Sequence, residues 1–397
     1  MTRDEILHSS PSVFATCITP NIVKKDVILS ILPESHIATR MESLRSSQLS
    51  NDSNSNMPKA TAQIIFQFWD PKDSGEQQLS SLLEVNHRLF WRTEQLEFNL
   101  CLEPERFDLV QILQIATVYL PNPSWDVHYD IFRYAGFTNV RTYHYCDVER
   151  KALDIENMLQ DLQEASEKSV FLLHASAHAP SGINPSMEQW KVIAKVVNQR
   201  KLFPFFYLDQ QGLASGDLEK DSWPIRYFVD QGLELFVAQS FSKIFGLYSE
   251  TVGNLIVVVK KPMVTESVNS QFTLLNVSRF SNPPAFGASL VHQVLTSPCL
   301  RKEWLEQLET MNKRMRENRL AFVLTLTQMG TPGTWSYIGR QSGLFCSLGL
   351  TRDQMNYLAR NHNFHLNKYR CFNISCLNKH NMEYFVKALD STVRNTM

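Results

Sequence analysis

Short runs of apolar residues alternate with longer stretches of helical spacing through the middle of the chain. The runs are rich in β-branched and aromatic residues and end in polar or turn-forming residues. They cover residues 118–121, 169–175, 201–208, 233–239 and 254–259. Runs that are apolar throughout are typical of strands buried on both faces. The pattern therefore predicts an α/β domain with a mostly parallel sheet.

Two further segments have the spacing of helices. Ser186 and Gln189 form a capping-box motif, and apolar residues then recur at helical spacing as far as Val197. This segment is predicted to be a crossover helix between parallel strands. A longer helix is predicted over residues 301–328, and Gly330 ends its pattern. In the remaining tail we expect a strand at 344–350 and helices at 352–361 and 381–393. These elements predict a second lobe.

Size and composition limit the classes of function. A chain of 397 residues with 43% hydrophobic content can bury one large core and a smaller second one. The 39 basic and 40 acidic residues argue against nucleic acid or an anionic membrane as a partner. Seven cysteines without a C-x-x-C pair predict reduced core thiols and no metal site. Residues 1–30 hold no apolar run long enough for a signal peptide or a membrane span, so we expect a cytoplasmic protein.

The most specific chemical signal is Lys243, which follows the apolar run at 233–239. It lies in the segment AQSFSKIFGLYSETVGN at 238–254, where Ser240 and Ser242 precede it and a glycine follows. A lysine at a strand end beside hydroxyl groups can bond covalently to an aldehyde cofactor while the serines hold its phosphate. On composition alone, a solvated surface lysine is the more frequent explanation of such a position.

The order of residues in this segment resembles the lysine motif of the cytosolic aspartate aminotransferases, which are pyridoxal 5′-phosphate (PLP) enzymes of fold type I. Further matching stretches lie at 11–15, 122–125, 173–175, 188–190, 202–206, 226–229, 281–284 and 331–335. The resemblance is dense over residues 118–300, looser towards the C-terminus and nearly untraceable over 20–115.

The resemblance implies an α/β fold of two domains. One is a large domain on a mixed, mostly parallel sheet, and the other is a smaller α/β domain made from both chain ends. We therefore expect residues 1–35 to form an N-terminal arm and part of the small domain. The large cofactor domain is expected over 36–300, and the interdomain helix and C-terminal small domain over 301–397. Residues 43–56, mostly small and polar, are expected to form a mobile loop. The family also implies a homodimer with active sites at the subunit interface.

Several positions match residues that contact the cofactor in the family. Lys243 matches the lysine that bonds to PLP and moves the proton of the substrate Cα, or it is a remnant of that lysine. The two serines before it match serines on the phosphate side, and Tyr248 matches a tyrosine of the same loop. Trp125 matches the tryptophan that stacks on the cofactor ring and also contacts substrate. His128 matches a histidine that supports that ring's surroundings. Trp125 and His128 fit equally well as ordinary core residues.

Other positions depart from the family pattern. Ala179 replaces the asparagine that donates to the ring oxygen. Gln210 replaces the tyrosine that donates to the same atom, and its side-chain amide is a weaker but possible donor to the cofactor. Tyr207 replaces the aspartate that protonates the ring nitrogen. Asp209 lies about 7 Å further along the same strand face and can substitute for that aspartate only after a register slip. Thr251 replaces the arginine that clamps the phosphate.

These departures predict weak cofactor binding. The family's phosphate turn also has no counterpart in residues 107–115. Charge-assisted hydrogen bonds contribute about 1.5–3 kcal/mol each, so the combined losses remove about 5–8 kcal/mol. At a factor of ten for about every 1.4 kcal/mol, the affinity for PLP falls by roughly four to five decades. We therefore expect PLP to bind weakly or not at all.

Substrate recognition departs from the family pattern as well. Arg370 best matches one of the two arginines that bind the substrate carboxylates, although its segment is one residue longer than in the family. Val277 stands where the second arginine reaches into the partner's site, and Arg279 is two residues away. A site with one arginine leaves a carboxylate of a dicarboxylic amino acid or 2-oxo acid unpaired, which lowers affinity and selectivity.

Three functions remain open on the sequence. The first is an aspartate aminotransferase of amino acid metabolism, converting L-aspartate and 2-oxoglutarate to oxaloacetate and L-glutamate with weak or altered activity. The second is a PLP enzyme of shifted reaction type, such as an amino-acid racemase. The third is a non-catalytic dimeric scaffold or regulator. Lys243 and its serines favour the enzymes, whereas Tyr207, Ala179 and Thr251 favour the scaffold.

Overall fold

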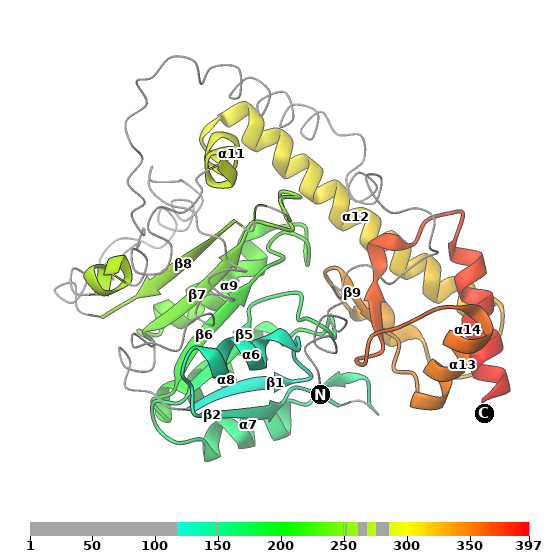
Figure 1. The fold of residues 1–397 in the computed structure, drawn as a ribbon, viewed down its shortest axis with the longest axis horizontal. Helices are drawn as coiled ribbons and strands as arrows, with labels where there is room; N and C mark the ends of the chain where they lie inside the picture. Colours follow the sequence, from blue (N-terminus) through cyan, green and yellow to red (C-terminus); the bar gives the residue numbers. More distant parts are fainter. Residues whose placement is uncertain are drawn as a thin grey trace, which may run out of the picture.

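The computed structural model describes residues 117–147, 150–248, 250, 252–260, 268–274 and 286–396. Within them, a six-stranded sheet has the order β2-β1-β5-β6-β7-β8 (Figure 1). The strands are β1 (Thr117–Asn122), β2 (Asn139–His144), β5 (Val170–His174), β6 (Phe203–Leu208), β7 (Leu235–Ser240) and β8 (Gly253–Val258). Neighbouring strands are parallel, except that β8 is antiparallel to β7. The predicted mostly parallel sheet is confirmed, and each of the apolar runs forms one of its strands.

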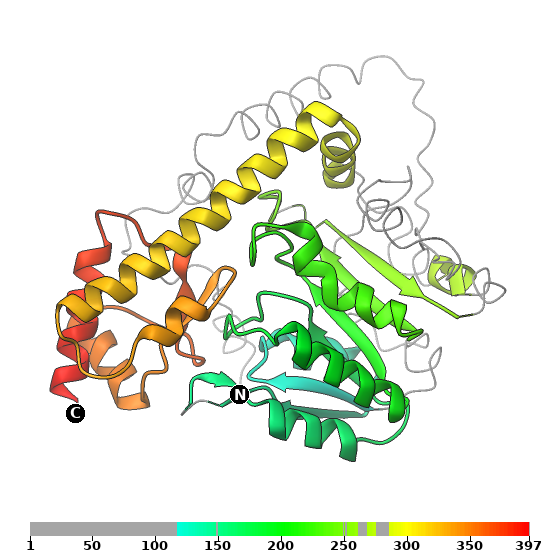
Figure 2. The same cartoon turned by 180° about the vertical axis from the view of Figure 1, so that it is seen from behind.

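Helices cover both faces of this sheet. They are α6 (Val127–Tyr134), α7 (Ile155–Glu164), α8 (Met187–Gln199) and α9 (Leu218–Asp230). The helices α7, α8 and α9 lie together across the face seen in Figure 2, where Trp190 of α8 packs on Phe206 of β6. Helix α6 covers the opposite face, where Phe132 packs on Phe205. Because successive residues of β6 enter different cores, the strand is apolar throughout.

The local signal for α8 is confirmed in detail. The Oγ of Ser186 accepts the backbone N–H of Gln189, and the Gln189 side chain accepts the N–H of Ser186. The apolar side chains that follow, including Trp190 and Ile193, are buried. The capping box therefore starts the helix that links β5 to β6.

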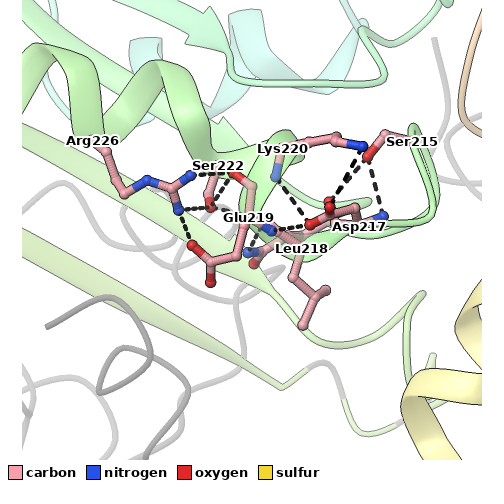
Figure 3. Close-up of polar contacts among 8 residues, drawn as sticks. Ser215, Asp217, Leu218, Glu219, Lys220, Ser222 and Arg226 are labelled. Carbon is pink, nitrogen blue, oxygen red and sulfur yellow. Dashed lines mark hydrogen bonds and ion pairs between the residues drawn. The ribbon is translucent and has the colours of Figure 1, made fainter. Parts of the chain in front are cut away.

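The start of α9 is fixed by polar contacts that Figure 3 shows. The Asp217 carboxylate accepts the backbone N–H groups of Glu219 and Lys220, which caps the helix. The guanidinium of Arg226 reaches back to the Glu219 carboxylate and the Ser222 hydroxyl. These contacts anchor the helix that follows the loop at the end of β6.

A long helix connects the sheet to a C-terminal lobe (Figure 1). The elements after the sheet are α11 (Phe286–Thr296), α12 (Pro298–Gln328), η2 (Ser336–Arg340), β9 (Phe345–Ser347), α13 (Arg352–His362), β10 (Cys371–Asn373), η3 (Ile374–Cys376) and α14 (Met382–Asn395). One face of the long helix is buried and includes Trp304, Leu308 and Met315. The predicted strand at 344–350 is shorter than expected, because only β9 pairs with β10.

Some sequence expectations lie outside the described residues. These are the N-terminal arm, the loop at 43–56, and the positions Thr251 and Val277. Among the cysteines that the structure describes, Cys346 and Cys371 are buried as expected, but Cys299 is exposed near the start of α12. The prediction of core thiols is therefore wrong for Cys299. Across the described ranges, no helix combines the length and apolar character needed to cross a membrane.

Candidate active site at the carboxyl edge of the sheet

The candidate site lies where four parallel strands end. Because β1, β5, β6 and β7 run in one direction, their carboxyl ends meet at the same edge of the sheet. Trp125 follows β1, His174 ends β5, Tyr207 lies near the end of β6, and Lys243 follows β7. Segments far apart in the sequence thus bring polar and aromatic side chains to one place.

Lys243 forms an ion pair at this edge. Its Nζ lies 2.5 Å from Oδ2 of Asp209, and its side chain is 13% exposed. Asp209 directly follows β6 and is 1% exposed. In the sheet, Tyr207 of β6 pairs with Ala238 of β7. Asp209 lies two residues further on, and the partner of its carboxylate is the Lys243 amine.

Two buried histidines contact the Tyr207 ring. The ring centroid of His128, from α6, lies 5.1 Å from that of Tyr207, and the centroid of His174, from β5, lies 5.2 Å away. A third histidine, His178, has its ring centroid 4.5 Å from that of His174. His128 also meets the half-buried Trp125 edge-on, with the centroids 5.3 Å apart. His128 therefore contacts both Trp125 and Tyr207.

These histidines are uncharged at neutral pH. Burial lowers the pKa of His174 to about 3, and burial also lowers the pKa values of His128 and His178 well below the usual range. The backbone N–H of Ala179 donates to Nδ1 of His174 at 3.5 Å, so the proton of this imidazole lies on Nε2. The histidines around Tyr207 therefore add no positive charge to the site.

The Gln210 side chain is engaged with the C-terminal lobe and the sheet edge. Its Nε2 donates to the carbonyl of Ala177 at 3.2 Å and to Oδ1 of Asp209 at 3.4 Å. Its Oε1 accepts the backbone N–H of Leu344 at 2.8 Å. Gly343 permits this approach, because a Cβ there would lie 2.4 Å from Cβ of Ala177. The Gln210 amide, a possible donor to the cofactor, therefore already forms hydrogen bonds to Ala177 and to Leu344.

The loop after Gln210 is held by the buried carboxylate of Asp221. This carboxylate accepts the backbone N–H groups of Gly212, Ala214 and Ser215 at 2.7, 3.2 and 3.1 Å. Burial raises the pKa of Asp221 to about 6, against the lowering effect of these hydrogen bonds. The loop that carries Asp209 and Gln210 is thereby fixed at its far end.

Two buried serines precede Lys243 in the chain. Ser240 ends β7, and its Oγ accepts the backbone N–H of Ser242 at 3.3 Å. The Oγ of Ser242 is buried and makes no hydrogen bond within the described residues. Tyr248 is half-buried a few residues after Lys243. The residue next to Lys243 in the chain thus holds a buried hydroxyl without a partner among the described residues.

Other buried polar atoms at this edge also lack partners among the described residues. They are Nε2 of His128, His174 and His178, Oγ of Ser176 and Oε1 of Gln239. Leaving a buried polar atom unpaired is costly, so such atoms in one region point to bound ligand or water. No group of three or more His, Cys, Asp or Glu side chains in the described ranges is arranged to hold a metal ion.

Arg370 lies half-buried in the turn before β10, in the left-handed region with φ +62°. Its neighbours Lys368 and Tyr369 both contact the carboxylate of Asp126, which directly follows Trp125. The C-terminal lobe thus places the segment of the predicted substrate arginine against the segment of the predicted ring-stacking tryptophan.

Sequence reasoning did not find two features of this site. His178 was not singled out, although its spacing of four residues from His174 at a strand end was a possible signal. Asp209 was considered only as a substitute for the replaced aspartate. Its partner Lys243 is 34 residues away, and their contact depends on two loop conformations that have no sequence signature.

Comparisons with known proteins agree with the resemblance. Residues 108–389 match the family described as aminotransferase class I and II. The cytoplasmic aspartate aminotransferase of Caenorhabditis elegans is 47% identical over 286 residues, which cover 72% of this chain and 70% of that protein.

Solved structures give the same result. An aspartate aminotransferase from Trypanosoma cruzi has a TM-score of 0.76 and 32% identity, covering 91% of this chain and 88% of that one. An aromatic-amino-acid aminotransferase from Burkholderia pseudomallei, covalently bound to pyridoxal phosphate, has a TM-score of 0.78 and 26% identity, covering 94% and 91%.

Proposed function

Because the chain belongs to the class I and II aminotransferase family, we propose that it is a cytoplasmic, aspartate aminotransferase-like protein that binds PLP weakly through Lys243. Its reaction would convert L-aspartate and 2-oxoglutarate to oxaloacetate and L-glutamate at a low rate. The observation that carries the proposal is the buried edge that holds Lys243 together with polar atoms that have no partner among the described residues, while Tyr207 stands where the family has a carboxylate.

The residues present fit the cofactor at one end. Lys243 supplies the amine, and Trp125 follows β1 and contacts His128 at this edge. The buried Oγ of Ser242 has no hydrogen-bond partner among the described residues. The fit is poorer at the ring nitrogen, since Tyr207 and the neutral His128 offer no carboxylate. Lys243 can therefore attach PLP. Because no carboxylate stands near the position of the ring nitrogen, we expect the transamination step to be slow.

The chain's own residues have separate tasks in this proposal. PLP, when bound, withdraws electrons from the substrate Cα. Lys243 holds the cofactor, and its Nζ, once released, takes the Cα proton and returns it. The segment of Arg370 would bind one substrate carboxylate. With Tyr207 in place of a carboxylate, the site lacks a group that keeps the ring nitrogen protonated, which reduces the withdrawal of electrons.

A second candidate is a non-catalytic dimeric scaffold or regulator on the same fold. The specific observation in its favour is that the site's polar groups already bond to one another. Lys243 is paired with Asp209, and Gln210 bonds to Ala177 and Leu344. These contacts join the sheet edge to the C-terminal lobe without a ligand.

Titration with PLP separates these candidates. We expect a visible absorbance band that needs high PLP concentrations and disappears on dialysis, because Thr251 replaces the phosphate-binding arginine. After borohydride reduction, mass spectrometry of peptides should find the pyridoxyl group on Lys243. Lys243→Ala should remove the band, whereas Lys191→Ala, at an exposed lysine, should not.

Other outcomes of this titration would contradict the proposal. PLP that survives long dialysis would show that another group replaces the arginine, so the claim of weak binding would be wrong. Modification spread over surface lysines, with Lys243 unmodified, would favour the scaffold. A coupled assay with aspartate and 2-oxoglutarate then measures whether bound PLP supports turnover.

We further propose that the protein is a homodimer. The proposal comes from the family-like segments at 11–15 and 281–284, which lie outside the described residues. Sedimentation equilibrium at micromolar concentration should give twice the chain mass of 45.8 kDa. A monomer under these conditions would contradict the proposal.

A further inference from the structure

In the ion pair between Asp209 and Lys243, a hydrogen bond from Gln210 holds the Asp209 carboxylate in place. Oδ2 of Asp209 meets Nζ of Lys243, and Oδ1 accepts from Nε2 of Gln210. Gln210 is itself held by the carbonyl of Ala177 and the backbone N–H of Leu344. The carboxylate is 1% exposed, so water screens its attraction for the ammonium poorly.

Two buried histidines interact with this pair, and Tyr207 packs against both of them. His128 of α6 interacts electrostatically with both members of the pair, and His174 of β5 interacts with Lys243. Burial keeps the pKa of both histidines far below neutrality. Tyr207 of β6 packs against both imidazole rings. At neutral pH these neighbours do not replace either charge of the pair.

We propose that Asp209 is the resting counter-ion of Lys243 and controls when this lysine can bond to a carbonyl compound. The inference rests on the proposed function, because a lysine that never forms such a bond needs no control. Asp209 acts through Lys243, so it is a positioning residue. Attack on a carbonyl needs the nitrogen lone pair, which the ammonium form lacks.

The chemistry balances without another reactant. The ammonium of Lys243 gives up two protons, its nitrogen forms a double bond to the carbonyl carbon, and the carbonyl oxygen leaves as water with those two protons. The first proton must leave before the C–N bond forms. A carboxylate in contact stabilises the ammonium and so opposes this first step. Removing the carboxylate should therefore make Lys243 more reactive at neutral pH.

Reductive methylation of the full chain with ¹³C-formaldehyde and cyanoborohydride, without PLP, tests this directly. Brief labelling from pH 6 to pH 10 is followed by mass spectrometry of the peptide that contains Lys243. The variants are Asp209→Asn, which keeps the shape but removes the charge, and Asp209→Glu, which keeps the charge. Glu188→Gln is the matched control, because Glu188 pairs with the exposed Lys191 at 2.9 Å.

For Asp209→Asn we expect the pH profile of Lys243 labelling to move lower by about 1–3 pH units, with at least about tenfold faster labelling at pH 7. Asp209→Glu should restore most of the wild-type profile. Glu188→Gln should change the profile of Lys191 by less, because that pair is exposed to solvent. A change in fold would also alter the labelling of other lysines, which should keep their wild-type profiles in Asp209→Asn.

Equal midpoints for the wild type and Asp209→Asn would overturn the proposal. If Asp209→Asn does not fold, Asp209→Ser is a second neutral variant, and it should also move the Lys243 midpoint lower. An unchanged midpoint in that variant would overturn the proposal as well. Because formaldehyde needs no phosphate site, failure to bind PLP would leave this result intact, so the two proposals fail separately.

Discussion

Tyr207→Asp is expected to speed the half-reaction with aspartate by about two to three decades when PLP is saturating. The substitution places a carboxylate at the position where the family keeps one for the ring nitrogen. A negative charge there stabilises a protonated ring, which withdraws electrons more strongly as Lys243 takes the Cα proton. His128, whose Nε2 lacks a partner among the described residues, lies next to the Tyr207 ring and can orient the new carboxylate. Stopped-flow absorbance of the cofactor's conversion to its amine form measures the rate.

Tyr207→Asn is the matched control for this experiment. It removes the same ring and leaves a side chain of nearly the same shape as aspartate, but it adds no charge. Both variants should lower the melting temperature, because Tyr207 is 6% exposed and packs in a core with Phe132 and Leu172. Only the aspartate variant should gain rate. An unchanged rate with saturating PLP, or a wild-type chain that already works at the family's ordinary pace, would contradict an impaired aminotransferase.

The sheet was predictable because its strands are buried on both faces. Runs such as 201–208 are apolar without interruption, and this pattern leaves few alternatives to a strand covered by helices. The start of α8 was predictable because Ser186 and Gln189 form a local motif. β2 was not predicted, since it is an edge strand whose side chains are mostly half-buried or exposed. Its apolar signal is correspondingly weak.

The site was predictable where a motif fixes a residue relative to a strand. Ser240 ends β7, and Ser242 and Lys243 follow it, as their order in the chain requires. Contacts between loops were not predictable in this way. The bond of Gln210 to Leu344 joins residues 134 positions apart, and it depends on the absence of a Cβ at Gly343. The resemblance gave the position of Gln210 and could not give its partner.

The histidine cluster shows how such partners change the expected chemistry. His128 was matched to the family by position alone, which left its charge open. The structure buries it with His174 and Tyr207, and burial lowers its pKa. The neutral histidines beside Tyr207 supply no negative charge, so they would not stabilise a proton on the ring nitrogen of PLP. A carboxylate restored at position 207 is therefore expected to raise the rate of the chemical step. It should leave the binding of the PLP phosphate unchanged.

Adding Thr251→Arg to Tyr207→Asp is expected to give a larger gain than either change alone at limiting PLP. The arginine restores a charge-assisted hydrogen bond to the phosphate, worth about 1.5–3 kcal/mol or roughly one to two decades in PLP affinity. It should leave the rate at saturating PLP almost unchanged, because the phosphate does not react. If the two effects are independent, their product is about three to five decades at limiting PLP.

Thr251→Lys is the control for this pair, because it adds the charge without the planar fork that binds two phosphate oxygens. It should tighten PLP binding less than arginine does. Adding Ala179→Asn should raise the rate further by restoring a donor to the ring oxygen. Equilibrium titration gives the affinity, and stopped-flow absorbance at saturating PLP gives the rate, so the two effects are measured separately. If Thr251→Arg changes the saturated rate and leaves PLP affinity as it was, residue 251 does not face the phosphate, and weak binding has another cause.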